Sequence, residues 1–358
     1  MNDDCLKLTT YFGERDRTPD GLLADELLGI YGGHRIQASI LLRGAEGFGR
    51  LHHLHTDRLL TLSEDLPVVS IAVDRRDRIE AMLEPILQIK RRGLITLERA
   101  RLLSGTIDEF EWPDELGEAT KLTVYVGRQE RVYKMSAFAA VCDLLYRRGI
   151  AGATVLLGVD GTNRGRRARA QFFGSNANVP TMVLAVGAGP QIARLLPELS
   201  GLLHEPLLTL ERVRVCKRDG ELLARPHELP AVDEHGLAMW QKLTIITSQA
   251  AAHDGRSIHS ELIRRLRATD AAGATSLRGI WGFHGDHAPH GDKFFQVRRH
   301  VPVVTIVVDT PEKIAASFDI VDELTAERGL VTSEMVPAMT AMSEEQTNGG
   351  LRLARHHF

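Results

Sequence analysis

The chain has 358 residues, of which 43% are hydrophobic and 25% charged, and its formal net charge at pH 7 is −3. This length and composition predict a globular protein of two or three domains, and the slightly acidic balance argues against nucleic acid or an anionic membrane as the partner of the whole surface. The sequence has no run of eighteen apolar residues, which argues against a transmembrane helix and against direct membrane insertion.

The first predicted element is a strand at residues 8–12, and similar strands open two later stretches, at 122–126 and 243–247. Three further landmarks follow each strand in the same order. They are an apolar run that ends in glycine (Gly44, Gly158, Gly279), a proline that opens an apolar strand (Pro67, Pro180, Pro302), and a segment related to Leu-Ile-Thr-Leu-Glu (94–98, 207–211, 330–334). The interval from strand to glycine is the same in all three stretches, so the sequence predicts three tandem copies of one module.

The third copy shows the elements of the module most clearly. A strand, a helix with an apolar residue every four positions and a second strand come first (243–247, 258–266 and 274–279). After a polar loop come a third strand, a helix that starts with a Thr-Pro cap and a fourth strand that begins after a glycine (302–308, 310–324 and 330 onward).

The polar segments between the copies predict linkers and a mobile end. The predicted boundaries are 5–103, 120–216 and 241–339 for the three modules, 104–119 and 217–240 for the linkers, and 340–358 for a flexible tail.

The order strand–helix–strand–strand–helix–strand is that of an α+β ferredoxin-like (βαββαβ) plait, with both helices on one face of an antiparallel sheet. The third strands, at 68–73, 181–186 and 303–308, are apolar on both faces, whereas a strand with one exposed face alternates. The far face of each sheet is therefore expected to be covered. The sequence predicts that the copies cover one another in an intramolecular pseudo-trimer, and association of separate chains is the competing explanation.

Several motifs carry a family resemblance. Residues 44–49 read GAEGFG, 62–67 LSEDLP and 93–98 GLITLE, and the third copy matches with GIWGFH at 279–284 and GLVT at 329–332. The chain resembles the PII-like family catalogued as domain of unknown function 190, related in fold to nitrogen regulatory protein PII, over nearly all of its length outside the linkers and tail. The second copy departs in its loop, with GVDGTN at 158–163, and has Pro206 in place of the glycine before the last strand.

The resemblance implies a signalling role. PII proteins are trimers of ferredoxin-like plaits that sense nucleotides in the clefts between subunits and move a long loop onto partner proteins. It therefore implies a small anionic effector, such as ATP, ADP, AMP or another nucleotide, and a protein partner contacted by the long loops. Genes of the family often lie beside fluoride-channel genes, which suggests a membrane transporter or channel as that partner.

The long loops, at 44–65, 158–178 and 279–300, begin with glycines whose backbone N–H groups could approach an anion. Basic residues precede the fourth strands or alternate along one face of them, and arginine forks suit phosphate or carboxylate. The predicted ligand site comprises Arg43, Gly44, Glu46, Gly47, Phe48, Gly49, Lys90, Arg91, Arg92, Gly93, Arg99, Arg101, Arg212, Arg214, Arg278, Gly279, Gly282, Phe283, Arg328 and Gly329. The alternatives are glycines that only turn the chain out of a strand, and arginines on an ion-paired surface.

Histidines concentrate in two of the loops, and neutral imidazole binds divalent metals well. The candidate metal ligands are His52, His53, His55, His284, His287 and His290. A metal-binding protein is therefore the second functional hypothesis, although the spacing matches no closed structural zinc site. A pH-responsive or merely polar loop is the alternative.

The loop of the second copy carries Arg164, Arg166, Arg167 and Arg169 before Phe172 and Phe173, a pattern that suits nucleic acid or an acidic partner as well as a solvated loop. The sequence shows no nucleophile elbow or ordered triad, so a binding protein is favoured over an enzyme acting on nucleotides. Cys5, Cys142 and Cys216 are scattered, as expected for free thiols in the cytoplasm.

Overall fold

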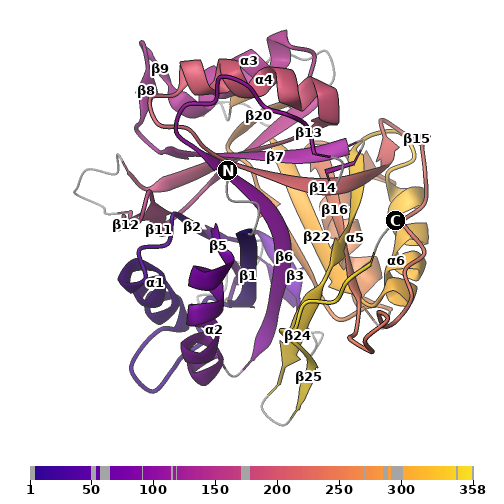
Figure 1. Ribbon diagram of the computed structural model, residues 1–358. Helices are drawn as coiled ribbons and strands as arrows, with labels where there is room; N and C mark the ends of the chain where they lie inside the picture. Colours follow the sequence, from indigo (N-terminus) through magenta and orange to yellow (C-terminus); the bar gives the residue numbers. More distant parts are fainter. Residues whose placement is uncertain are drawn as a thin grey trace.

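The computed structural model of the chain describes residues 5–49, 54–56, 65–90, 92–113, 116–117, 119–170, 178–269, 271–284, 289–291, 301–343 and 346–356. Within these residues the chain is a mixed α+β protein with six helices and mostly antiparallel strands. Figure 1 shows the helix pairs at the outside of the molecule and the strands between them. None of the helices in the described part of the chain is both long and apolar enough to cross a membrane.

Each of the three repeats has the predicted order of elements. Repeat one consists of β1 (Cys5–Gly13), α1 (Leu23–Gly33), β2 (Ala38–Arg43), β5 (Pro67–Arg75), α2 (Arg76–Ile89) and β6 (Gly93–Ser104). Repeat two consists of β7 (Ala119–Gly127), α3 (Ala137–Arg147), β10 (Gly152–Leu157), β13 (Pro180–Ala188), α4 (Gly189–Leu202) and β14 (Leu207–Arg218). Repeat three consists of β16 (Trp240–Ser248), α5 (Ile258–Arg267), β19 (Ala274–Arg278), β22 (Pro302–Asp309), α6 (Pro311–Leu324) and β23 (Leu330–Val336).

The four main strands of each repeat pair antiparallel in the spatial order second, third, first, fourth. The orders are β2-β5-β1-β6, β10-β13-β7-β14 and β19-β22-β16-β23. One face of each sheet packs against the two helices of its own repeat and forms a separate hydrophobic core.

Helix α6 illustrates how the local sequence sets these elements. The hydroxyl of Thr310 accepts a hydrogen bond from the Lys313 amide at 3.4 Å, and Pro311 occupies the first turn, where no amide donor is needed. The predicted stripe, which includes Ile314 and Phe318, is buried against the sheet. Gly329 then reverses the chain with a φ of +112°, in the region that favours glycine.

The other faces of the three sheets meet in one shared core. It contains Val69 and Ile71 of β5, Met182 and Leu184 of β13, and Val304 of β22. The strands are apolar on both faces because one face contacts the helices of the same repeat and the other contacts the other repeats.

The fourth strands form a closed cycle of pairings. Residues 101–104 of β6 pair with 207–210 of β14, and residues 214–218 of β14 pair with 330–333 of β23. Strand β24 (Ala338–Met342), which follows β23 after Pro337, pairs with residues 93–97 of β6. Strand β14 is therefore paired with the fourth strands of both other repeats, and β24, the continuation of β23, closes the cycle by pairing with β6 (Figure 1).

The C-terminal segment differs from the flexible tail expected over 340–358. Strand β24 continues into β25 (Thr347–Gly350), Ala354 is fully buried, and the Arg99 guanidinium donates to the Ala354 carbonyl at 2.9 Å. Ala338 and Met342 pack in the core of repeat one, while Met339 and Ala341 pack in a cluster on the other side. The segment is ordered because it completes the sheet edge of a repeat that lies far away in sequence.

The long loops contain secondary structure of their own in their described parts. They begin with hairpins: β3 (Glu46–Phe48) with β4 (Leu54–Thr56), β11 (Asp160–Asn163) with β12 (Arg166–Arg167), and β20 (Trp281–His284) with β21 (His290–Gly291). The first strand of each hairpin pairs with the second main strand of another repeat, as β3 with β19, β11 with β2 and β20 with β10. These contacts form a second closed cycle, from repeat one to three, three to two and two to one.

Candidate functional site

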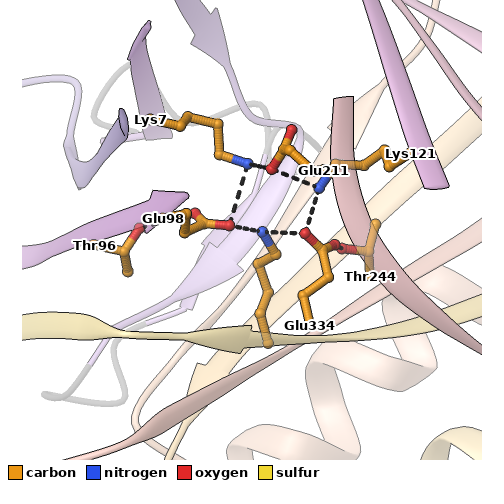
Figure 2. A network of polar contacts seen from close by, with 8 residues as sticks. Lys7, Thr96, Glu98, Lys121, Glu211, Thr244 and Glu334 are labelled. Atoms are coloured by element: carbon orange, nitrogen blue, oxygen red, sulfur yellow. Dashed lines mark hydrogen bonds and ion pairs between the residues drawn. The ribbon is translucent and has the colours of Figure 1, made fainter. Parts of the chain in front are cut away.

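A ring of six buried charged residues lies where the three repeats meet. Lysines on the first strands alternate with glutamates on the fourth strands, and this central ring consists of Lys7, Lys121, Lys242, Glu98, Glu211 and Glu334. Figure 2 shows the amino groups and carboxylates alternating around it. Side-chain exposure in the ring lies between 4% and 7%.

Each lysine joins two repeats. The Nζ atoms of Lys7, Lys121 and Lys242 lie 3.2, 3.1 and 3.0 Å from the glutamate of their own repeat, which is Glu98, Glu211 and Glu334, respectively. The same atoms also contact the glutamate of the next repeat, in the pairs Lys7–Glu211, Lys121–Glu334 and Lys242–Glu98. Three positive and three negative charges therefore balance inside the protein.

Burial opposes ionisation of Glu98 and Glu334, but the neighbouring ammonium groups outweigh it. Lys121 and Lys242 hold the pKa of Glu334 at about 2, and Lys242 and Lys7 likewise hold the pKa of Glu98 well below its ordinary range. The hydroxyls of Thr96 and Thr244 donate to Glu98 and Glu334 at 3.2 and 3.3 Å. Carboxylate oxygens of the three glutamates lie within 4.8 Å of one another, as in an acidic metal site, but the lysines already neutralise them. The ring is therefore suited to fixing the mutual orientation of the repeats.

Three equivalent interfaces surround this centre, and each places the first strand of a loop hairpin beside the first helix of another repeat. Each long loop begins with a Gly-x-x-Gly segment, at residues 44–47, 158–161 and 279–282. The third residue of this segment faces the helix, and it is Glu46, Asp160 or Trp281 in repeats one, two and three, respectively. The contents of the three interfaces differ.

An arginine fills the interface between repeats two and one. Arg167 donates to both carboxylate oxygens of Asp160, at 3.2 and 2.7 Å, and its guanidinium lies 4.0 Å from Asp25 of α1. Arg169 also pairs with Asp25, at 2.9 Å. The side chain of Arg167 packs beside Gly32. A Cβ atom on Gly32 would lie 3.5 Å from that side chain.

Aromatic rings fill the interface between repeats three and two. Trp281 meets Phe138 of α3 edge-to-face with 6.1 Å between ring centroids, and Phe283 meets Tyr146 in the same way at 5.4 Å. Phe283 is also part of the core of repeat two. This interface is an extension of that core.

The interface between repeats one and three contains an open cavity of about 780 Å³, here called the 1–3 cleft. Its lining is formed by Glu46, Gly255, Arg256, Ser257, Ser260, Glu261, Arg264, Arg267 and Ala268. The Ser260 hydroxyl donates to Glu46 at 2.7 Å, and the Ser257 hydroxyl donates to Ser260 at 3.1 Å. The lining of the cleft thus consists mainly of charged and hydroxyl-bearing residues, with arginines outnumbering glutamates.

Glu261 holds the arginines of the cleft in position. The Nε and one terminal nitrogen of Arg264 donate to its two oxygens at 2.8 and 2.5 Å, and Arg256 lies 3.6 Å away. Hydrogen bonds from Arg264 and Arg265 lower the pKa of Glu261 to about 2, so it is ionised at neutral pH. A guanidinium has five N–H donors, and Arg264 therefore has donors beyond the two that Glu261 accepts.

Among the residues predicted for the ligand site, Glu46 lines the 1–3 cleft, but the glycines of the loops have another role. The Gly44 amide donates to the Pro67 carbonyl at 2.7 Å and the Gly279 amide to that of Pro302 at 2.8 Å. A Cβ on Gly47 would lie 2.7 Å from the Ala274 carbonyl oxygen, and one on Gly282 would lie 2.3 Å from that of Ala153. Gly47 and Gly282 permit close approach between repeats, and anion binding by the glycine amides of the loops stays a prediction.

The aromatic residues of the same motifs are also structural. Phe48 packs in the core of repeat three and Phe283 in the core of repeat two, both 4% exposed. Gly49 follows Phe48, and a Cβ there would meet nothing within 4 Å.

Lys90 lies inside the protein and does not face a cleft. Its ammonium donates to the carbonyls of Tyr11 and Arg92 at 3.0 and 2.6 Å and lies 5.2 Å from the centroid of the Phe12 ring. Burial lowers its pKa to about 7, partly offset by Asp16. Gly93 follows it with a φ of +94°, and Arg91 lies outside the described residues.

Several of the remaining predicted arginines contact linkers or the C-terminal segment, although Arg99 and Arg212 are exposed. Arg101 lies over the Phe110 ring at 5.9 Å, Arg214 contacts His227 at 2.6 Å, and Arg212 lies beneath Gly117. Arg43 pairs with Glu14 at 2.8 Å on the surface. Arg278 ends β19, and Arg92 and Arg328 are exposed in the turns before the fourth strands of repeats one and three. Ligand binding by this set of arginines stays a prediction.

Only some of the predicted metal ligands lie within the described residues. His52, His53 and His287 lie outside the described residues, His55 and His290 lie on β4 and β21, and His284 contacts Asp219 at 2.7 Å. In the second copy, Arg164 pairs with Glu205 at 3.1 Å, while Phe172 and Phe173 also lie outside the described residues. Metal binding by the histidine loops stays a prediction.

Comparison with known proteins finds similarity in all three repeats. The family DUF190, described as "Uncharacterized ACR", matches residues 5–102, 119–215 and 240–338, which together make up more than half of the chain. A UPF0166 protein of Aquifex aeolicus (strain VF5) is 32% identical over 94 residues, which are 26% of this chain and 88% of that protein. The relative is thus matched over most of its length by a segment about as long as one repeat.

Proposed function

This chain belongs to the DUF190 family of uncharacterized proteins, and from that premise we propose that it is a PII-like regulatory protein that binds a small anionic ligand in the 1–3 cleft. The ligand would bind between repeats, and the adjoining loop would carry the signal to a protein partner in the cytoplasm. A membrane transporter or channel is a partner of the kind that the family resemblance implies. On this proposal the protein acts by binding and not by catalysis.

The architecture that we propose is three ferredoxin-like plaits packed as an intramolecular pseudo-trimer. The strand order within each repeat, the two closed cycles of strand pairing and the alternating charges of the central ring support it. A relative about one repeat long would reach the same arrangement by associating as three chains.

The observation that carries the proposed function is the open, arginine-lined cleft at one of three equivalent interfaces. Arg167 occupies one of the other two, and Trp281 and Phe283 occupy the other. The cavity of about 780 Å³ lies in the range of small-molecule sites, and guanidinium groups bind phosphate and carboxylate.

Glu46 connects the cleft to the long loop of repeat one. It lies on β3, at the beginning of that loop, and accepts the hydrogen bond from Ser260 on α5. A ligand that contacts both sides would favour the loop state in which β3 is held against repeat three. Such a ligand shifts the loop only by its difference in affinity for the two states.

The test measures binding of small anions to the purified protein by calorimetry and thermal unfolding. At a hundred times its dissociation constant, a ligand specific for the folded state adds about 2.7 kcal/mol to stability. We expect the double substitution Arg264→Ala/Arg267→Ala to abolish this gain. Arg147→Ala, which removes an exposed arginine at the end of α3, should leave it unchanged. Binding that survives the loss of Arg264 and Arg267 would place the ligand elsewhere.

A further inference from the structure

We infer that the ligand of the 1–3 cleft is a phosphorylated polyol, recognised by its phosphate and its hydroxyls, and not a nucleotide recognised through its base. This inference rests on the proposed function and specifies the chemistry of the same site. It follows from the distribution of charge, hydroxyl groups and apolar surface along the cleft wall.

One side of the cleft is built for an anion. Arg264 and Arg267 line it from α5, and Arg256 lines it from β18 (Arg256–Ser257), the short strand before that helix. Glu261 accepts two hydrogen bonds from Arg264, and this fixes the plane of the guanidinium before any ligand arrives. Several guanidinium groups around one cavity match a phosphate, which offers three oxygens at its charged end.

The lining residue from the other repeat, Glu46 on β3, suits hydroxyl groups. Glu46 is only 7% exposed, and the hydrogen-bond chain from Ser257 through Ser260 ends on its carboxylate. A carboxylate only accepts hydrogen bonds, so it suits a hydroxyl donor and repels a second phosphate. The cleft therefore fits a ligand with one anionic end and a neutral, hydroxylated end.

The described lining offers no surface on which a base could stack. It contains no aromatic side chain, and its apolar contribution comes from Gly255, Ala268 and the aliphatic parts of longer side chains. Stacking of a base on an aromatic ring contributes roughly 1–3 kcal/mol, which a nucleotide would lack here. At the interface between repeats three and two, the equivalent wall is aromatic, but its rings are packed against one another.

The arginines of the cleft belong to repeat three alone. At the same distance from the first strand, Arg264 is matched by Asp143 in repeat two and by Gly29 in repeat one. Arg267 is matched by Tyr146 and Gly32. One chain should therefore bind one phosphorylated polyol.

Three probes test the inference: inorganic phosphate, ribose 5-phosphate, which adds the hydroxylated sugar, and AMP, which adds the adenine base. Titration calorimetry of the full chain should give one ribose 5-phosphate per chain, bound at least tenfold more tightly than phosphate. AMP should gain nothing from its adenine and bind no more tightly than ribose 5-phosphate. Glu46→Gln should weaken ribose 5-phosphate about tenfold while leaving phosphate binding unchanged, and Ser260→Ala should act in the same direction.

Each other outcome has a distinct meaning. Tighter binding of AMP that still depends on Arg264 and Arg267 would overturn the polyol inference and leave the proposed function intact. Equal affinity for phosphate and ribose 5-phosphate would overturn the hydroxyl recognition. Failure of every probe and of a wider panel of small anions would overturn both proposals. Glu46→Gln and Ser260→Ala both test recognition of the hydroxyl groups, so the test remains decisive if one of these variants does not fold.

Discussion

Single residues of this chain bury charge in two ways. In the central ring every lysine contacts two glutamates, so the cost of desolvation is offset by attraction between close opposite charges. Within the described part of the chain, Lys90 forms no such ion pair. Backbone carbonyls and the Phe12 ring surround its ammonium instead.

Lys90 should make stability depend on pH above neutrality. Its pKa is about 7 in the folded protein, against an ordinary value of 10.5, so between these values the unfolded chain holds a proton that the folded chain has released. Stability should therefore rise with pH in this window, by at most about 2–3 kcal/mol from pH 7 to pH 9. In Lys90→Met this contribution should be absent, as measured by urea unfolding at each pH.

The control for this experiment is Lys134→Met, at an exposed turn, which should keep the slope of the parent protein. Equal slopes in the parent and in Lys90→Met would mean that Lys90 stays protonated in the folded state throughout this pH range.

At the scale of elements, the hairpins that open the long loops connect the repeats. Strand β3 lies against β19 of repeat three, and its Phe48 enters the core of that repeat. The Gly-x-x-Gly segment makes this possible because its second glycine has no side chain. The backbone of the other repeat occupies the space that a Cβ atom would need.

Gly47→Ala should therefore destabilise the protein. The added Cβ would lie 2.7 Å from the Ala274 carbonyl oxygen and 3.1 Å from the Pro67 ring, so β3 must move away from β19. We expect a loss of about 1–3 kcal/mol in urea unfolding. Gly49→Ala, two residues later, meets nothing within 4 Å and should change stability by less than about 0.5 kcal/mol. Similar losses in both variants would contradict the role assigned to close approach.

The sequence alone was sufficient to predict those helices and strands that are determined by neighbouring residues in the chain. The cap at Thr310 and the stripe of α6 depend on neighbouring residues, and both are present in the structure. The hairpins and strand β24 escaped prediction because they are stabilised by pairing with repeats that lie about a hundred residues or more away. A segment of three to five residues carries little information about such a partner.

The candidate site was predictable only in part, for a related reason. Glu46 belongs to a recognisable glycine motif, whereas Arg264 and Arg267 lie on an ordinary amphipathic helix. Their signal is the contrast with Gly29 and Gly32 at the matching positions of repeat one. The lysines of the central ring gave a similar signal, because each stands at the same place in its first strand. Neither pattern reveals the contact until the repeats are packed together.

At the scale of the whole molecule, fusion of three repeats in one chain allows the interfaces to diverge. The central ring and the two cycles of pairing keep the arrangement closed, while one interface contains an arginine, one contains aromatic rings and one is open. A symmetric trimer of identical chains would have three identical interfaces. The fused chain can therefore reserve a single interface for a ligand.

Closure of the fourth-strand cycle depends on β24, and this gives a prediction for the intact chain. A chain that ends at Pro337 leaves the edge of β6 at residues 93–97 without its partner, and an unpaired edge recruits strands from other molecules. We expect this variant to associate in light-scattering measurements, whereas the full chain of 39.6 kDa remains monomeric. A chain that ends at Met342 keeps β24 and loses the cover that includes Ala354, so it should be less stable but still monomeric. Association of both truncated chains to the same extent would assign the effect to the lost cover, and monomeric behaviour of both would show that β24 does not protect this edge.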